Sequence, residues 1–287
     1  MTASRQVGRI GHILSAAVIG LIAAAGFALA AQPILLWESN LEKSSAVARA
    51  GGKPMFLEFW AVDCAPCKEM DADVYSNERV VKAMDKVVPV RVDMDLQGGT
   101  ARKYGVAATP TILLTDSFGN ELFRFSGLLP VDAMLRLLDE LPGDVARINQ
   151  WSERLARNKR DAVALEALGR ELRSASLYRA SNRYYARALK DSRPAASASA
   201  RADMLEAMGR NHVALKEYKE AARLFEQLLR ESPGRPAEPD IMLSLGRALL
   251  AQDRKPDAHR ILRTLADRYP AATESAEAQR LINGRDP

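Results

Sequence analysis

Cysteine and histidine are scarce in this chain of 287 residues, which contains two cysteines and three histidines. Cys64 and Cys67 are separated by two residues, whereas the histidines are scattered along the chain at positions 12, 212 and 259. A structural zinc site needs four ligands, so we expect neither a metal site nor any other cofactor. Because the chain lacks a second cysteine pair, a redox role for this one would require an external partner to reset it.

Charged residues are absent between Arg9 and Glu38. A basic start is followed by an uncharged apolar run and by small residues at 28–30, the order typical of a secretory signal peptide, which we place at residues 1–31. The alternative is a retained anchor, because residues 13–37 are long enough to span a bilayer. Under either interpretation the rest of the chain is exported, so we expect a periplasmic protein that is free or anchored to the inner membrane.

A basic patch interleaved with aromatic residues is also missing, although the second half of the chain is basic. Residues 38–142 carry 12 Lys and Arg against 16 Asp and Glu, and residues 143–287 carry 27 against 20. This change of sign suggests two modules. The basic excess is spread at helical spacing, which favours a solvated surface over nucleic-acid binding.

The first module alternates strands and helices. Apolar runs predict strands at 55–60, 87–95, 110–116 and 121–127, and helical patterns occupy 39–54, the stretch from the cysteines to about Asp85, a short segment near residue 100, and 130–141. This order predicts an α/β domain over residues 38–142. Pro142-Gly143 is a breaker pair and marks the candidate boundary to a second domain at 143–287.

The second module has no strand signal but contains an internal repeat. Three units each have a Gly-Arg pair, a small residue twelve positions after the glycine, and a bulky apolar residue sixteen positions after it. The glycines are Gly169, Gly209 and Gly246, the small residues Ser181, Ala221 and Ala258, and the bulky residues Tyr185, Phe225 and Leu262. The pattern predicts helix pairs in which the small residue lets the second helix approach the glycine on the first.

These units resemble tetratricopeptide repeats, at about 162–195, 202–235 and 239–272, followed by a capping helix. The resemblance implies an all-α domain that makes protein–protein contacts. An irregular helical bundle is the alternative.

The pair Cys64-Ala65-Pro66-Cys67 allows three interpretations. Half of a metal site would lack its other ligands, and a structural disulfide across two residues closes too short a loop to add much stability. A redox pair needs a strand that ends at a helix N-terminus, where the first sulfur is stabilised as a thiolate and the second lies one turn on. The strand-like MFLEFW before the cysteines and the helical stretch after them supply that order.

Two motifs give this module a resemblance to the thioredoxin family, over roughly Trp37 to Leu141. They are EFWAVDCAPCK around the cysteines and DLQGGTARKYGVAATPT further on. The module is similar to thioredoxin itself and to the C-terminal periplasmic domain of the DsbD interchange protein. The resemblance implies a thioredoxin fold and thiol–disulfide oxidoreductase activity.

The resemblance also implies roles for individual residues. Cys64 would attack as the nucleophile, Cys67 would resolve the mixed disulfide, and Glu58 would be a buried acid that takes a proton from the resolving thiol. The surface that contacts the substrate would comprise Trp60, Asp63, Ala65, Pro66, Thr109 and Pro110. Trp60 is expected to serve packing more than chemistry. Pro110 would be cis, the alternative being an ordinary trans proline at an edge strand, and Glu58 could instead form a salt bridge without catalytic duty.

Three positions depart from the thioredoxin pattern. Asp63 replaces the tryptophan before the first cysteine, so repulsion should raise the thiol pKa of Cys64, against the opposing charge of Lys68. Arg91 replaces a lysine near the buried acid, and contact with Glu58 would keep that acid ionised. Ala72 replaces a proline that kinks the helix.

The sequence therefore predicts an exported thiol–disulfide oxidoreductase whose protein substrates are recruited by the repeats. Pro66 resembles the reducing members of the family, which favours a reductase over an oxidase. The alternative is a redox-linked chaperone or binding scaffold in which the repeats hold clients. The intact set of Cys64, Cys67 and Pro110 argues against an inactive scaffold.

Overall fold

The computed structural model describes residues 34–191 and 197–284. The predicted signal peptide at 1–31 lies outside these residues, as does most of the predicted anchor at 13–37. Within the described residues, no helix is both long enough and apolar enough to cross a membrane.

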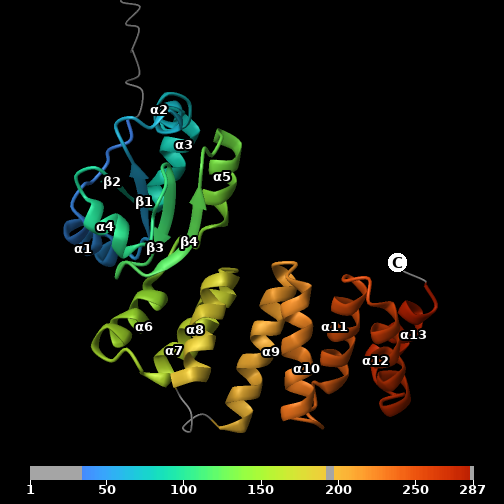
Figure 1. The fold of residues 1–287 in the computed structure, drawn as a ribbon. Helices are drawn as coiled ribbons and strands as arrows, with labels where there is room; N and C mark the ends of the chain where they lie inside the picture. The colour runs from blue at the N-terminus through green and yellow to red at the C-terminus, as the bar shows by residue number, and fades with distance from the viewer. Residues whose placement is uncertain (1–33, 192–196, 285–287) are drawn as a thin grey trace, which may run out of the picture. The chain divides into compact units, whose positions relative to one another are not determined.

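A four-stranded mixed sheet forms the centre of the first domain (Figure 1). Its strands are β1 (Met55–Trp60), β2 (Val88–Asp93), β3 (Thr111–Thr115) and β4 (Glu121–Ser126), in the spatial order β2-β1-β3-β4. β1 runs parallel to β2 and antiparallel to β3, and β3 and β4 form an antiparallel hairpin. The four predicted strands and the hairpin are confirmed.

The helices of this domain are α1 (Leu41–Gly51), α2 (Ala65–Glu69), α3 (Glu78–Ala83), α4 (Gly98–Lys103) and α5 (Val131–Glu140). Asn40 caps α1 by accepting a hydrogen bond from the backbone N–H of Lys43. The predicted continuous helix from the cysteines to Asp85 is wrong. α2 passes into a π-helix, Met70–Val74, and the chain then turns before α3, because the Asn77 side chain starts a new helix by accepting from the backbone N–H of Arg79.

The two faces of the sheet are covered by different helices, because successive residues of β1 point to opposite faces. Leu57 packs with Ala48 of α1 and Ala101 of α4. Phe56 belongs to the other core, which contains Met70 and residues of α3 and α5. Glu58, two residues after Phe56, therefore faces the side that carries the helix of the cysteines.

Helices α7 to α12 form three pairs in the second domain (Figure 1). They are α7 (Ala162–Ser174) with α8 (Tyr178–Asp191), α9 (Ala198–Ala214) with α10 (Tyr218–Glu231), and α11 (Glu238–Leu250) with α12 (Lys255–Arg268), followed by α13 (Thr273–Ile282). A Cβ added at Gly209 would lie 2.6 Å from the ring of Phe225, and one at Gly169 would lie 2.5 Å from Tyr185. The bulky residue thus packs directly on the glycine.

Helix α6 (Ala146–Arg157) had no counterpart in the sequence analysis, although it lies just beyond the Pro142-Gly143 pair. Its Ser152 donates a hydrogen bond of 2.6 Å to Asp116, a fully buried carboxylate at the end of β3. Its Asn149 accepts from the backbone N–H of Ser117 at 3.0 Å. Burial raises the pKa of Asp116, and the hydrogen bonds that it accepts oppose that rise. Two buried hydrogen bonds therefore connect α6 to the turn between β3 and β4.

Candidate active site

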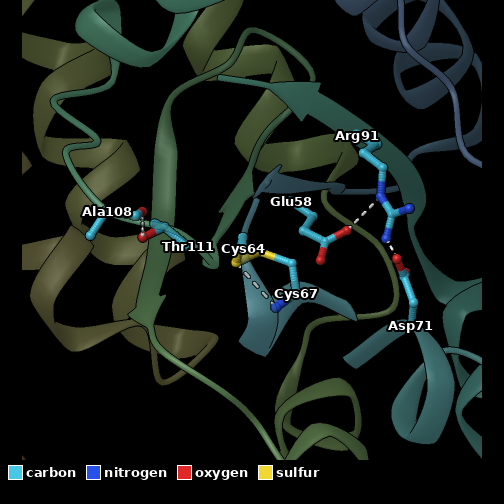
Figure 2. The surroundings of a disulfide bond; sticks show 7 residues. All are labelled: Glu58, Cys64, Cys67, Asp71, Arg91, Ala108 and Thr111. Atoms are coloured by element: carbon cyan, nitrogen blue, oxygen red, sulfur yellow. Dashed lines mark hydrogen bonds and ion pairs between the residues drawn. A yellow bond between two sulfur atoms is a disulfide. The ribbon is translucent and has the colours of Figure 1, made fainter. Parts of the chain in front are cut away.

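The two cysteines lie where β1 gives way to helix α2, and they form a disulfide bond (Figure 2). Cys64 is the N-cap of α2, and the backbone N–H of Cys67 donates to its Sγ at 3.1 Å. Cys64 keeps 8% of its surface exposed, whereas Cys67 keeps 1%. The more accessible cysteine is thus the one at the helix N-terminus, which is the arrangement that a nucleophile and a resolving thiol require.

Pro110 stands immediately before β3, and the Thr109–Pro110 peptide bond is cis, as the resemblance implies. The carbonyl oxygen of Pro110 accepts a hydrogen bond of 2.9 Å from the backbone N–H of Gly127. The following Thr111 donates its hydroxyl to the carbonyl of Ala108 at 2.8 Å, which fixes the segment around the proline (Figure 2). Contact of Thr109 and Pro110 with a substrate stays a prediction.

Glu58 is fully buried, and it lies opposite Arg91 in the parallel register of β1 and β2. The Nε of Arg91 donates to Glu58 Oε2 at 2.8 Å, and its Nη2 donates to Asp71 of the π-helix (Figure 2). Glu58 Oε1 finds no hydrogen-bond partner in the described part of the chain. One guanidinium therefore joins two carboxylates that come from different elements.

Three aromatic rings surround the Arg91 guanidinium. Its central carbon lies 4.6 Å from the ring centre of Trp37, 5.2 Å from that of Trp60 and 5.9 Å from that of Tyr75. Trp37 reaches this position because Glu38, its neighbour, bridges to β2 and accepts from the Arg91 backbone at 2.8 Å. The rings hold the guanidinium between the two carboxylates.

Trp37 corrects the extent of the predicted membrane anchor, which was drawn to residue 37. Its ring packs against the core of the domain, with its centre 4.9 Å from that of Tyr75. The apolar composition of a sequence segment does not distinguish a membrane-spanning helix from a segment that packs on a protein core. Here Trp37, the last residue of the apolar segment, packs on the core of the domain.

Burial raises the pKa of Glu58 to about 7, although the contact with Arg91 acts to lower it. The predicted contact between the two side chains is confirmed, but it does not hold the pKa of Glu58 at the ordinary value of a carboxyl group. Desolvation outweighs one positive charge that is shared with Asp71. Burial, followed by the charge of Glu58, also raises the pKa of Tyr75 well above its usual value. Glu58 can therefore exchange a proton near neutral pH.

Asp71 and Tyr75 were missed by the sequence analysis. Asp71 comes four residues after Cys67, one helical turn further on. This spacing could have indicated that Asp71 lies on the same face of the helix as Cys67. The hydroxyl of Tyr75 is buried, and it lies close enough to the Glu58 carboxyl to act to lower the pKa of that group. Both side chains face Glu58 only because the π-helix packs over the sheet, which the sequence pattern does not specify.

The remaining predicted contact residues surround Cys64. Asp63, Ala65 and Pro66 are exposed, and Trp60 is half-buried. Asp63 forms no ion pair within the described residues. The expected effect of its charge on the thiol pKa of Cys64 stays a prediction. The helix changes from α to π over Met70–Val74, the stretch in which Ala72 replaces the expected proline.

Among residues 34–191 and 197–284, no group of three or more His, Cys, Asp or Glu side chains is placed to hold a metal ion. The functional groups gathered at the site are two sulfurs, a buried acid and a shared guanidinium. Such a set can transfer electrons by thiol–disulfide exchange and can transfer the proton that accompanies it.

Two family models match the chain. One describes a thioredoxin-like domain and matches residues 41–142, and the other describes a tetratricopeptide repeat and matches residues 212–282. The chain is thus similar to a thioredoxin-like domain over the first span and to tetratricopeptide repeats over the second. The predicted fold class is thereby confirmed, because the sheet and helices agree with the first model and the helix pairs with the second.

Relatives of the thioredoxin-like domain include the thiol:disulfide interchange protein DsbD of Yersinia pestis (strain Pestoides F). It is 31% identical over 111 residues, which are 36% of this chain and 19% of the relative. Protein disulfide-isomerase erp38 of Neurospora crassa is 29% identical over 159 residues, or 55% of this chain and 42% of the relative. The chain thus spans less than half the length of either relative.

A solved structure of the DsbD C-terminal domain from Neisseria meningitidis, in the oxidised form, is also similar. It is 20% identical, and the match covers 37% of this chain and 98% of that domain with a TM-score of 0.32. Because that score is low, the fold assignment rests on the sheet topology and the family models.

Proposed function

We propose that this protein is an exported thiol–disulfide oxidoreductase that reduces disulfides in proteins, with its repeats recruiting those proteins. The proposal is carried by one observation. Cys64 and Cys67 lie at the N-terminus of α2, in the same domain as the buried carboxyl of Glu58, whose pKa is about 7. We place the thioredoxin-like domain at residues 38–142 and the repeat domain at 143–287.

The reaction begins with the reduced pair. The Cys64 thiolate attacks one sulfur of a client disulfide, a mixed disulfide forms, and the other client sulfur leaves as a thiolate. The Cys67 thiol then loses its proton to the Glu58 carboxylate, directly or through one water, and attacks Cys64 Sγ. The client departs with two thiols and the pair becomes the disulfide. Two electrons pass from the pair to the client, and an external dithiol restores the pair by the reverse exchange.

The direction and location of the reaction rest on the sequence. Pro66 between the cysteines resembles the reducing members of the family, and the N-terminal apolar run resembles an export signal. Export would place the pair in the periplasm, either free or held at the inner membrane by the N-terminal segment. The external dithiol and the clients would meet the protein there.

Insulin reduction tests the proposed activity. With dithiothreitol as the terminal reductant, we expect the wild-type protein to accelerate the precipitation of insulin chains, because it relays electrons to the insulin disulfides. The matched control is the Cys64→Ser variant, which should show only the background rate of dithiothreitol. A wild-type protein that gives no acceleration would rule out the enzymatic function.

A binding function is the second candidate, and a cavity in the chain favours it. The cavity has a volume of about 820 Å³ and is lined by β4, the end of α5 and the turn between α7 and α8, with Leu122, Leu177 and Leu215 among its apolar residues. Such a surface could hold an unfolded client segment. If Cys64→Ser suppresses the aggregation of a reduced, cysteine-free client as well as wild type does, binding is the primary function.

A further inference from the structure

Asp71 is half-buried on the π-helix and bonds to the same guanidinium as the fully buried Glu58. We propose that Asp71 is a positioning residue, which withholds part of Arg91 from Glu58 and so keeps the buried carboxyl able to take up a proton. An effect of Asp71 on catalysis rests on the proposed function, in which Glu58 is the base for Cys67. The effect of Asp71 on the pKa of Glu58 does not depend on that function.

The hydrogen bonds of Arg91 carry this inference. The Nε and Nη2 hydrogens lie on one edge of a guanidinium, and together they can grip a single carboxylate through two parallel bonds. In this protein the two donors are divided, Nε to Glu58 at 2.8 Å and Nη2 to Asp71. Glu58 thus receives one of the two bonds that a bidentate pair would supply, and its Oε1 stays without a partner among the residues described.

The surroundings keep Arg91 in this divided position. The rings of Trp37 and Trp60 lie 4.6 and 5.2 Å from its central carbon. The Arg91 side chain is 19% exposed and that of Asp71 is 41% exposed. Asp71 is therefore within reach of solvent, while the carboxyl that it influences is not.

The groups that act on the pKa of Glu58 are Arg91 of β2, Asp71 of the π-helix, and Tyr75, the residue after that helix. Cys67 of α2 lies on the same side as the Glu58 carboxyl in Figure 2. The charge of Asp71 acts on Glu58 in the same direction as burial, raising its pKa, while Arg91 lowers it. Removing Asp71 should therefore lower the pKa of Glu58 in two ways, because a negative charge disappears and Nη2 becomes free to grip the carboxylate.

Carboxyl titration by NMR of the oxidised protein tests the coupling without any thiol chemistry. In Asp71→Ala we expect the pKa of Glu58 to fall by about one pH unit. Asp71→Asn keeps an acceptor for Nη2 but loses the charge, so it should give a smaller fall, and Asp71→Glu should restore the wild-type value. The matched control is Asp73→Ala, an exposed carboxylate of the same π-helix, which should leave Glu58 unchanged.

An unchanged pKa of Glu58 in Asp71→Ala, or an equal fall in Asp73→Ala, would overturn the inference. A second readout is the pH profile of insulin reduction, whose acid limb should move to lower pH in Asp71→Ala but not in Asp73→Ala. If the titration shifts as expected and the wild-type protein does not reduce insulin, the proposed function fails while the role of Asp71 stands.

Discussion

Replacing Cys67 by serine is expected to stop the exchange reaction halfway, so that Cys67→Ser accumulates mixed disulfides with its protein substrates. Cys64 is the more exposed sulfur and caps α2, so it can still attack a client disulfide. A serine at the buried position 67 cannot resolve the product. Non-reducing electrophoresis and mass spectrometry of the trapped species would measure the accumulation and identify the partners.

The matched control is Cys64→Ser, which keeps the buried thiol and loses the nucleophile. We expect it to trap no client and to lose insulin reduction by at least ~10³-fold. Both variants remove the disulfide, so a difference between them cannot arise from the loss of the cross-link. Trapping by Cys64→Ser instead of Cys67→Ser would reverse the two assigned roles.

Replacing Glu58 by glutamine is expected to remove a pH-dependent loss of stability. The folded-state pKa of Glu58 is about 7, above its ordinary value of 4.5. Between these values the folded state holds a proton that the unfolded state has released, so the free energy of unfolding falls as pH rises through this window. The loss amounts to about 2–3 kcal/mol between pH 5 and pH 8, and Glu58→Gln should not show it.

Chemical denaturation of the oxidised protein at several pH values would measure this effect, since the cysteines do not titrate in the disulfide. Asp116 is also buried with a raised pKa, but it is common to both proteins and cancels in the comparison. Glu69→Gln, at an exposed carboxylate of α2, is the matched control and should follow the wild-type curve. Parallel pH curves for wild type and Glu58→Gln would contradict the assigned pKa.

The local features of the site could be predicted from the sequence. Apolar runs bounded by breakers gave the four strands, and the spacing of Cys64 from β1 placed it at a helix start. Features that depend on packing between distant segments could not be predicted. Trp37 packs over Arg91 because its neighbour bridges to β2, and α6 binds Asp116 across 36 positions of sequence.

The protonation of Glu58 marks a second limit of sequence reasoning. Counting charges led to the expectation that Arg91 would keep the acid ionised, and the contact between the two side chains does form. Two features of the three-dimensional structure nevertheless raise the pKa of Glu58 to about 7. Glu58 is fully buried, and Asp71 takes a share of the guanidinium. Burial and competition for one donor cannot be derived from the spacing of residues along the chain.

The reduction potential of the Cys64–Cys67 pair, measured by equilibration with glutathione, decides in which direction electrons flow between the pair and its clients. We predict a value near −270 mV, about that of a reducing thioredoxin, so that electrons flow from the pair to client disulfides. A value near −120 mV, about that of a strong oxidant, would contradict it, because the pair would then take electrons from client thiols.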